Sequence, residues 1–121
     1  FVGNRMQHAL WREAIALIND GVCTAEGVDN VVKNSFGLRL PVLGPIENAD
    51  LVGLDLTLDI HNVILKSLNR DVEPADILKS KVERSEWGVK SGRGFRSWQN
   101  GQADALRQRL TAHLLETQQK Q

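Results

Sequence analysis

Apolar residues near the start of this chain recur with the period of an α-helix. On a wheel at about 100° per residue they cover one half of the circumference. The residues on this half are Met6, Leu10, Trp11, Ala14, Ile15, Leu17 and Ile18. Polar side chains, including His8 and Arg12, fall on the other half. Gly21 ends the pattern, because glycine enters the left-handed conformation beyond a helix end at little cost. The spacing therefore predicts a helix over residues 2–20, which must be buried along one side.

Capping residues set the boundaries of the next two predicted helices. Thr24 is suited to an N-cap and Glu26 to the first turn, so a second helix is expected to begin here and to close at Gly37. Proline and glycine then interrupt any continuous helix. Pro45 suits the first turn of a short helix that ends near Gly53.

Residues 54–68, LDLTLDIHNVILKSL, are apolar around most of a helical wheel. Alternating leucines also fit a strand, but the length and a clean polar stripe favour a helix. The stripe consists of Asp55, Asp59, Asn62 and Lys66. An apolar arc of about 220° predicts burial on more than one side of this helix.

The rest of the chain is predicted to be helical apart from one glycine-rich loop. Pro74 is expected to open a helix that reaches Glu86, and residues 87–98 form the loop. A last amphipathic helix carries a narrow seam of Leu106, Leu110 and Leu114. The pattern predicts an all-α fold and a single domain over residues 1–121.

Composition excludes several classes of protein. The 121 residues carry 15 basic and 15 acidic side chains, so no net field attracts nucleic acid or anionic lipid. No apolar run is long enough to span a bilayer. The single cysteine, Cys23, fits a reducing compartment, and we expect the cytoplasm. Because Phe1 is not an initiator, we expect that a longer polypeptide extends upstream.

Residues for independent catalysis are sparse. His8, His61 and His113 fall on different predicted helices, without the spacing of metal ligands, so no metal site is expected. His61 lies inside the wide apolar arc and is interpreted as a core or interface histidine. Cys23 is interpreted as a small inert apolar residue. The sequence GVKSGRG follows no predicted strand, so no dinucleotide site is expected within this chain.

The loop over residues 87–98 allows two interpretations. Its cations are interleaved with aromatic residues, which is a pattern of nucleic-acid binding. A neutral chain with few such cations makes this the weaker interpretation. In the other, the aromatic side chains pin the loop onto neighbouring helices. The cations are Lys90, Arg93 and Arg96, and the aromatic residues are Trp87, Phe95 and Trp98.

Asn4 stands beside the apolar face of the first helix, and two explanations remain equal on the residues alone. Its amide could satisfy free backbone N–H groups at the helix start. Alternatively, it points into a site shared with whatever precedes Phe1.

Three segments, taken in order, resemble one family over residues 1–98. FVGNR resembles the P-G-F-x-x-N-R junction of the L-3-hydroxyacyl-CoA dehydrogenases. GPIENADLVGLD resembles their G-P-F-x-x-x-D-x-x-G-L-D connection, and GVKSGRGFRSW resembles their G-x-K-[ST]-G-x-G-F-Y segment. Each motif alone is weak, but the ordered set is specific.

The resemblance implies a compact multi-helix domain of the type found at the C-terminus of 6-phosphogluconate dehydrogenase. It further implies a missing N-terminal Rossmann domain that binds NAD and holds the His–Glu base pair. The family oxidises the 3-hydroxyl of an acyl-CoA to a ketone. Asn4 matches its active-site asparagine, an orienting amide. The implied partners are the chain's own Rossmann domain, a second copy bound through the helical domain, and the acyl-CoA. This chain alone should then be inactive.

Two departures from the family pattern bear on the substrate. The longer segment FGLRLPVLGP carries Arg39 and looks closer to the branch of lambda-crystallin and L-gulonate 3-dehydrogenase, which acts on small hydroxy acids. Arg39 would then bind a substrate carboxylate bidentately, whereas the alternative is a merely exposed arginine. Arg96 replaces the family's usual tyrosine. Outside the enzyme class, a free-standing helical interaction module remains an alternative.

Overall fold

The computed structural model describes residues 1–119, and they are predominantly helical. Seven α-helices occur in this part of the chain: α1 Val2–Asn19, α2 Ala25–Asn34, α3 Phe36–Arg39, α4 Pro45–Val52, α5 Leu54–Ile64, α6 Asp76–Glu83 and α7 Gln102–Gln119. Short 3₁₀ turns occupy Leu65–Ser67 and Val89–Ser91. Residues 1–119 contain no strand, only isolated bridges that join Gly88 to Arg93 and Arg93 to Ser97. The predicted all-α class is confirmed.

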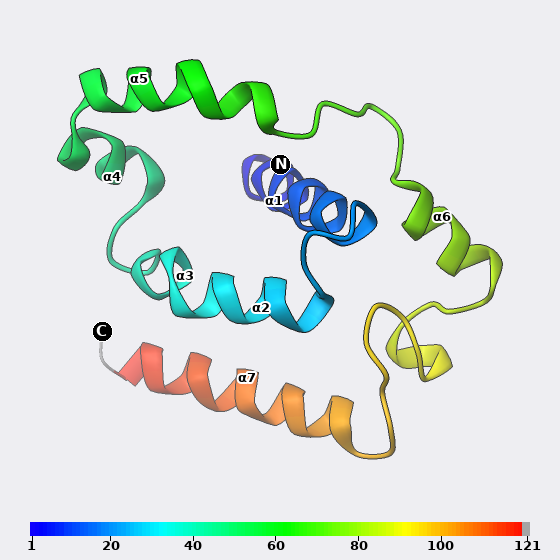
Figure 1. Ribbon diagram of the computed structural model, residues 1–121. Helices are drawn as coiled ribbons and strands as arrows, with labels where there is room; N and C mark the ends of the chain where they lie inside the picture. Colours follow the sequence, from blue (N-terminus) through cyan, green and yellow to red (C-terminus); the bar gives the residue numbers. More distant parts are fainter. Residues whose placement is uncertain (120–121) are drawn as a thin grey trace. The chain divides into compact units, whose positions relative to one another are not determined.

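The chain divides into two units, Phe1–Leu78 and Lys79–Gln121. In the first unit, α1 lies between α5 on one side and α2 with α3 on the other, while α4 leads from α3 into α5 (Figure 1). The second unit contains the end of α6, the glycine-rich loop and α7.

The end of α1 confirms the predicted stop. The N–H of Asp20 donates to the carbonyl of Ala16, and Gly21 follows with φ +72°. The N–H of Val22 then donates to the carbonyl of Leu17 at 2.9 Å, which closes the last turn. At the other end, the N-cap position is held by Phe1 without a side-chain hydrogen bond.

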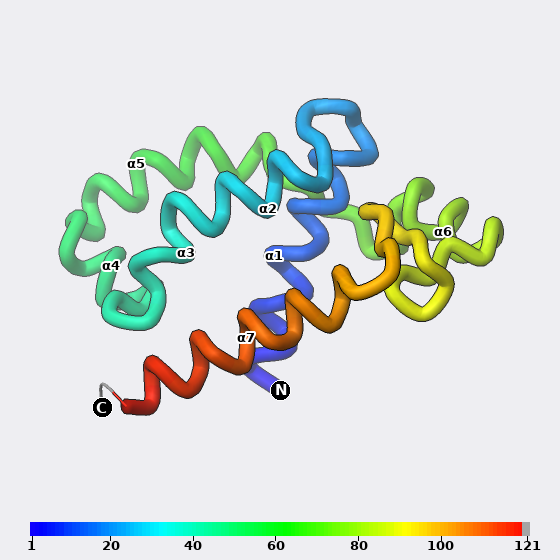
Figure 2. The backbone as a smooth tube through the Cα atoms, turned by 90° about the horizontal axis from the view of Figure 1, so that it is seen from below, coloured from blue at the N-terminus to red at the C-terminus, as the bar shows by residue number. Residues whose placement is uncertain are grey.

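The start of α2 also follows the prediction, but its end does not. The Thr24 hydroxyl accepts the N–H of Gly27 at 3.0 Å. The helix stops at Asn34, before Gly37, which lies inside α3. A Cβ at Gly37 would stand 2.4 Å from the carbonyl oxygen of Val32. Glycine is needed here for a close backbone approach, and the prediction that it caps a helix is wrong. In two views α3 continues nearly along the line of α2 (Figures 1 and 2).

A one-residue turn separates α4 from α5. Pro45 is the first residue of α4, as predicted, and the Gly44 N–H donates to the Glu47 carboxylate at 2.9 Å. Gly53 ends the helix with φ +111°, a backbone conformation that residues other than glycine rarely adopt. Leu54 begins α5 immediately afterwards.

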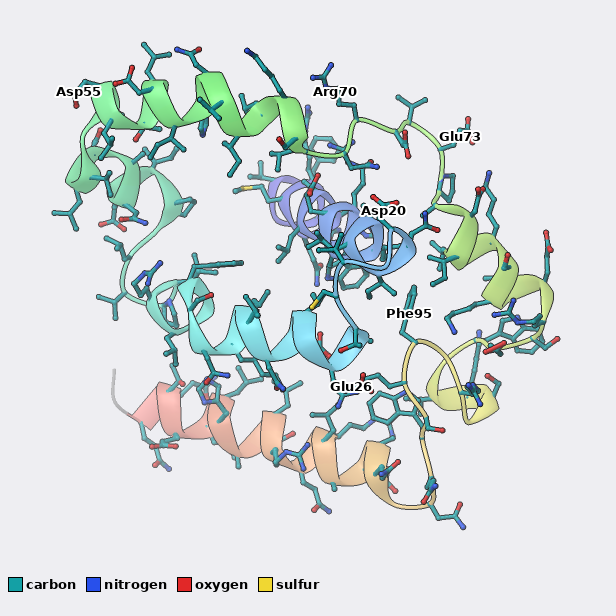
Figure 3. All side chains as sticks on the ribbon, in the orientation of Figure 1. Asp20, Glu26, Asp55, Arg70, Glu73 and Phe95 are labelled. Atoms are coloured by element: carbon teal, nitrogen blue, oxygen red, sulfur yellow. The ribbon has the colours of Figure 1, made fainter. Side chains whose placement is uncertain are left out.

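The described chain does not bury the apolar arc of α5. Leu58 is 62% exposed and Val63 is 72% exposed, although they lie on the apolar side of the wheel. In Figure 3 the side chains of α5, beginning near Asp55, extend on both sides of the helix. His61 is exposed, so its interpretation as a core residue of this chain is wrong. The large apolar side chains of α5 are all at least 46% exposed within residues 1–119.

Helix α6, which begins in the first unit and ends in the second, is shorter than predicted. α6 begins at Asp76 rather than at Pro74 and ends at Glu83 rather than at Glu86. The side-chain carbonyl of Asn19 accepts the N–H of Ile77 at 3.0 Å, which ties the first turn to α1. Ser85 adopts φ +60° and ends the helical path.

Buried apolar surface is scarce in the described chain. Ala16 is its only buried hydrophobic residue, with 9% of its surface exposed. The leucines of the predicted seam on α7 are exposed by 38–56%. No helix within residues 1–119 is long and apolar enough to cross a membrane.

Candidate functional site

The first turn of α1 presents Asn4 to solvent. The residue is exposed and lies inside the helix, two positions after the first helical residue. No described residue forms a hydrogen bond with its side chain, and no side chain caps the helix. Its amide is therefore not used as a helix cap. A neutral amide carries both a donor and an acceptor, so it can orient a hydroxyl or a carbonyl oxygen.

Arg39 is the last residue of α3 and is also exposed. Its carbonyl accepts the N–H groups of Val42 and Leu43, which holds the backbone in the turn towards α4. Its guanidinium has no ion pair or hydrogen bond with any described residue. Asn4 and Arg39 thus each offer an unused polar group, and no contact within residues 1–119 joins them.

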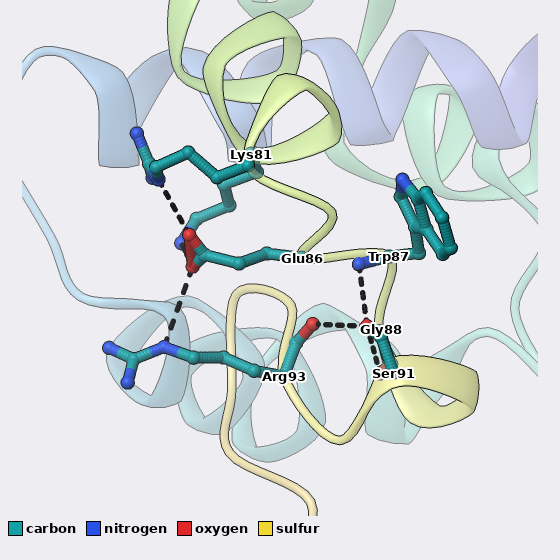
Figure 4. Close-up of polar contacts among 7 residues, drawn as sticks. Lys81, Glu86, Trp87, Gly88, Ser91 and Arg93 are labelled. Carbon is teal, nitrogen blue, oxygen red and sulfur yellow. Dashed lines mark hydrogen bonds and ion pairs between the residues drawn. The ribbon is translucent and has the colours of Figure 1, made fainter.

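The most elaborate polar network surrounds the carboxylate of Glu86 in the second unit. Arg84 Nε lies 2.6 Å from Oε2, while Lys81 Nζ and Arg93 Nε lie 3.5 Å and 3.4 Å from Oε1 (Figure 4). The Glu86 side chain is only 18% exposed. The hydrogen bond from Arg84, followed by the positive charges of Arg84 and Lys81, lowers the pKa of Glu86 despite partial desolvation. This cluster ties the end of α6 to the glycine-rich loop.

Ser91 organises the loop itself. Its hydroxyl accepts the N–H of Trp87 at 2.7 Å and lies within hydrogen-bonding distance of the carbonyls of Gly88 and Arg93 (Figure 4). The N–H of Gly88 donates to the carbonyl of Arg93 at 2.8 Å. Gly94 is buried where the loop folds back on Gly88, and a Cβ at Gly94 would stand 2.8 Å from the Cα of Gly88. The loop is held by its own hydrogen bonds.

Of the three aromatic residues that the second interpretation names, Trp87 and Phe95 contact α6. The Trp87 indole N–H donates to the carbonyl of Val82 at 3.2 Å, and the Lys81 ammonium lies 5.5 Å from the centre of the Phe95 ring. Lys90 lies over Trp87 at 5.7 Å. Arg93 is paired with Glu86. Two of the cations considered for nucleic-acid binding, Lys90 and Arg93, thus contact neighbouring side chains of this segment.

Sequence reasoning did not identify Glu86 or Ser91 as organising residues. The serine of GVKSGRG was part of a quoted motif, but the three cations around Glu86 come together only when the loop folds back on α6. Within the described residues no group of three or more His, Cys, Asp or Glu side chains could hold a metal ion. Cys23 is half-buried and forms no disulfide within the described residues.

Comparison with known proteins gives a consistent result. The family model described as 3-hydroxyacyl-CoA dehydrogenase, C-terminal domain, matches residues 1–98. A 5-formyl-3-hydroxy-2-methylpyridine 4-carboxylate 5-dehydrogenase of Mesorhizobium japonicum is 33% identical over 106 residues, which cover 88% of this chain and 34% of that protein. A probable 3-hydroxybutyryl-CoA dehydrogenase of Bacillus subtilis is 38% identical over 96 residues, 78% of this chain and 32% of that protein.

The fold has a close counterpart among solved structures. The crystal structure of a 5-formyl-3-hydroxy-2-methylpyridine 4-carboxylic acid 5-dehydrogenase, described as an NAD⁺-dependent dismutase, matches with a TM-score of 0.92 and 30% identity. The match covers 98% of this chain and 38% of that chain. The chain thus spans about a third of the length of these relatives.

Proposed function

Because the chain belongs to the 3-hydroxyacyl-CoA dehydrogenase family, whose C-terminal domain it matches, we propose that it is the helical substrate-binding domain of an NAD-dependent enzyme. The intact enzyme would oxidise the 3-hydroxyl of an acyl-CoA to the 3-keto compound, a reaction of fatty acid metabolism, in the cytoplasm. The match over residues 1–98, which includes all three motifs, carries this proposal.

We assign NAD to a nucleotide-binding domain preceding Phe1. A dinucleotide is held by a glycine-rich turn between a strand and a helix, and residues 1–119 form no strand. When bound there, NAD would accept hydride from the substrate carbon. The general base would also belong to that domain. This chain alone should therefore show no NAD reduction with 3-hydroxybutyryl-CoA, and measurable turnover by the isolated chain would contradict the division of roles.

Asn4 would orient the reacting oxygen. The support is its exposed amide, free of any described partner, at the end of α1 where an upstream domain would join. The test uses the intact enzyme, with Asn4→Ala compared against Asn62→Ala, an exposed asparagine on α5. Removal of one oriented polar group from a transition state lowers kcat by about a hundredfold. We expect that loss for Asn4→Ala only. Equal activity of the two variants would exclude a role for Asn4.

The second candidate function is oxidation of a small carboxylated hydroxy acid, such as L-gulonate. The unpaired guanidinium of Arg39 favours it, because such a group binds a carboxylate through two hydrogen bonds. The Mesorhizobium relative, named for a pyridine carboxylate, is consistent with it. In the intact enzyme, Arg39→Gln should raise the KM for gulonate while Arg70→Gln, at another exposed arginine, should not. Faster turnover of 3-hydroxybutyryl-CoA than of gulonate would favour the first candidate function, oxidation of a 3-hydroxyacyl-CoA.

A homodimer through the helical domain is the third part of the proposal. The chain exposes 9927 Å². Even two separate compact bodies of the sizes of its two units would expose only about 7,800 Å² together. The difference of about 2,000 Å² is enough for contacts of about 800 Å² each with the proposed upstream domain and with a second copy. Exposed leucines along α5 support the same conclusion. Sedimentation equilibrium should find a dimer, and a strict monomer at high concentration would refute it.

A further inference from the structure

We infer that His8 is a second substrate-contacting residue, which binds an oxygen next to the one that Asn4 orients. The inference rests on the proposed function of Asn4 and adds a specificity-determining group to the same site. Nothing in the three family motifs includes His8, since FVGNR ends three residues before it.

Helix geometry puts the two side chains together. Asn4 and His8 are four residues apart in α1, so their Cβ atoms are neighbours at about 6 Å on one face. Trp11 follows three residues after His8 on that face. All three side chains are exposed in the described chain, and Trp11 retains 47% of its surface. A ligand above the first two turns would therefore meet the amide and the imidazole at once.

The imidazole contacts an aromatic ring, and its polar atoms are unused. The His8 and Trp11 rings lie 5.0 Å apart between centres and are tilted by 58°, an ordinary geometry for an aromatic pair. No hydrogen bond from a described residue reaches either ring nitrogen. The indole thus packs against one side of the imidazole, while the N–H of the imidazole remains available to donate.

The spacing suits a 3-hydroxy acid or its thioester. These substrates carry a hydroxyl at carbon 3 and an oxygen at carbon 1, two carbons away. Asn4 would orient the hydroxyl at the reacting carbon, and His8 would donate to the oxygen at carbon 1. That oxygen is present in both candidate substrate classes, so the assignment holds for either. Because carbon 1 does not react, the His8 contact has nearly the same strength in the ground state and the transition state.

This difference between the two residues gives a kinetic test in the intact enzyme, with NAD reduction by 3-hydroxybutyryl-CoA as the assay. His8→Phe keeps an aromatic ring against Trp11 but removes the donor. We expect its KM to rise about five- to tenfold with kcat nearly unchanged. His8→Gln retains an N–H donor and should recover most of the affinity. Asn4→Ala should instead lower kcat.

A matched control is His113→Phe, which changes an exposed histidine of α7 outside residues 1–98. It should alter neither constant. If His8→Phe leaves KM unchanged, or if His8→Phe and His8→Gln raise it equally, the inference is wrong, while a kcat loss in Asn4→Ala would keep the proposed function. If Asn4→Ala retains full activity, the proposed site itself fails.

Discussion

Two glycines of the loop, Gly92 and Gly94, should respond oppositely to the same substitutions. Gly92 has φ +81°, and the nearest heavy atom to a Cβ there would be the Trp98 carbonyl oxygen at 3.8 Å. Gly94 has no such backbone requirement, but its Cβ would stand 2.8 Å from the Cα and 3.1 Å from the nitrogen of Gly88. Gly92 is therefore required for its conformation and Gly94 for its lack of volume.

The expected magnitudes follow from these two causes. An alanine forced into the left-handed region costs about 1–2 kcal/mol, and asparagine, which enters that region more readily, should cost less at Gly92. At Gly94, added atoms in a filled space cost about 1–3 kcal/mol for alanine. Asparagine is larger and should cost more. The order of the two substitutions thus reverses between the two positions.

Urea unfolding followed by circular dichroism measures these differences, with all variants at one protein concentration because association changes apparent stability. The design uses four variants, Ala and Asn at each of the two glycines. The reasoning is refuted if asparagine is less destabilising than alanine at Gly94, or if both positions rank the substitutions alike.

Three further changes test the local structure. Glu86→Gln should lower the free energy of unfolding at neutral pH. Because Arg84 lowers the pKa of Glu86, the stabilisation is present above the ordinary glutamate range and is lost as the pH falls through the folded pKa. The difference in unfolding free energy between the original chain and the variant should therefore disappear in acid. Gly37→Ala should cost about 1–3 kcal/mol in urea unfolding, since its Cβ would meet the Val32 carbonyl oxygen at 2.4 Å. Thr24→Ala should cost about 1 kcal/mol and Thr24→Ser much less, because the hydroxyl caps α2.

Helix ends could be predicted from the sequence where nearest neighbours alone decide them. Gly21 and Gly53 both have positive φ, and the Thr24 hydroxyl accepts an N–H only three residues on. The prediction that Gly37 closes a helix is wrong because glycine has two structural roles that a sequence does not distinguish. One is a left-handed turn, and the other is a close approach to a backbone atom of a neighbouring turn. Only the fold tells them apart.

The position of Asn4 in the candidate site could be predicted from the sequence, but the polar cluster around Glu86 could not. Helical periodicity placed Asn4 at the head of α1, and the family motif supplied its proposed role. The Glu86 cluster was not foreseen, since Lys81, Arg84 and Arg93 converge only after α6 ends early and the loop turns back. Such a convergence depends on the positive φ of Ser85 and on glycines that let the loop cross itself.

The apolar arc of α5 correctly predicts a helix, but the side chains of the arc are exposed in the described chain. An arc so wide does require cover on more than one side, because exposed leucine surface costs about 25 cal/mol per Å² relative to buried surface. The described chain leaves Leu54 and Leu58 each 62% exposed, so the cover is not supplied from within. We propose that this face of α5 is a surface for association, and His61 on the same helix is expected in that contact. A second copy is the simplest partner, because the same face is then buried on both chains by one symmetric contact.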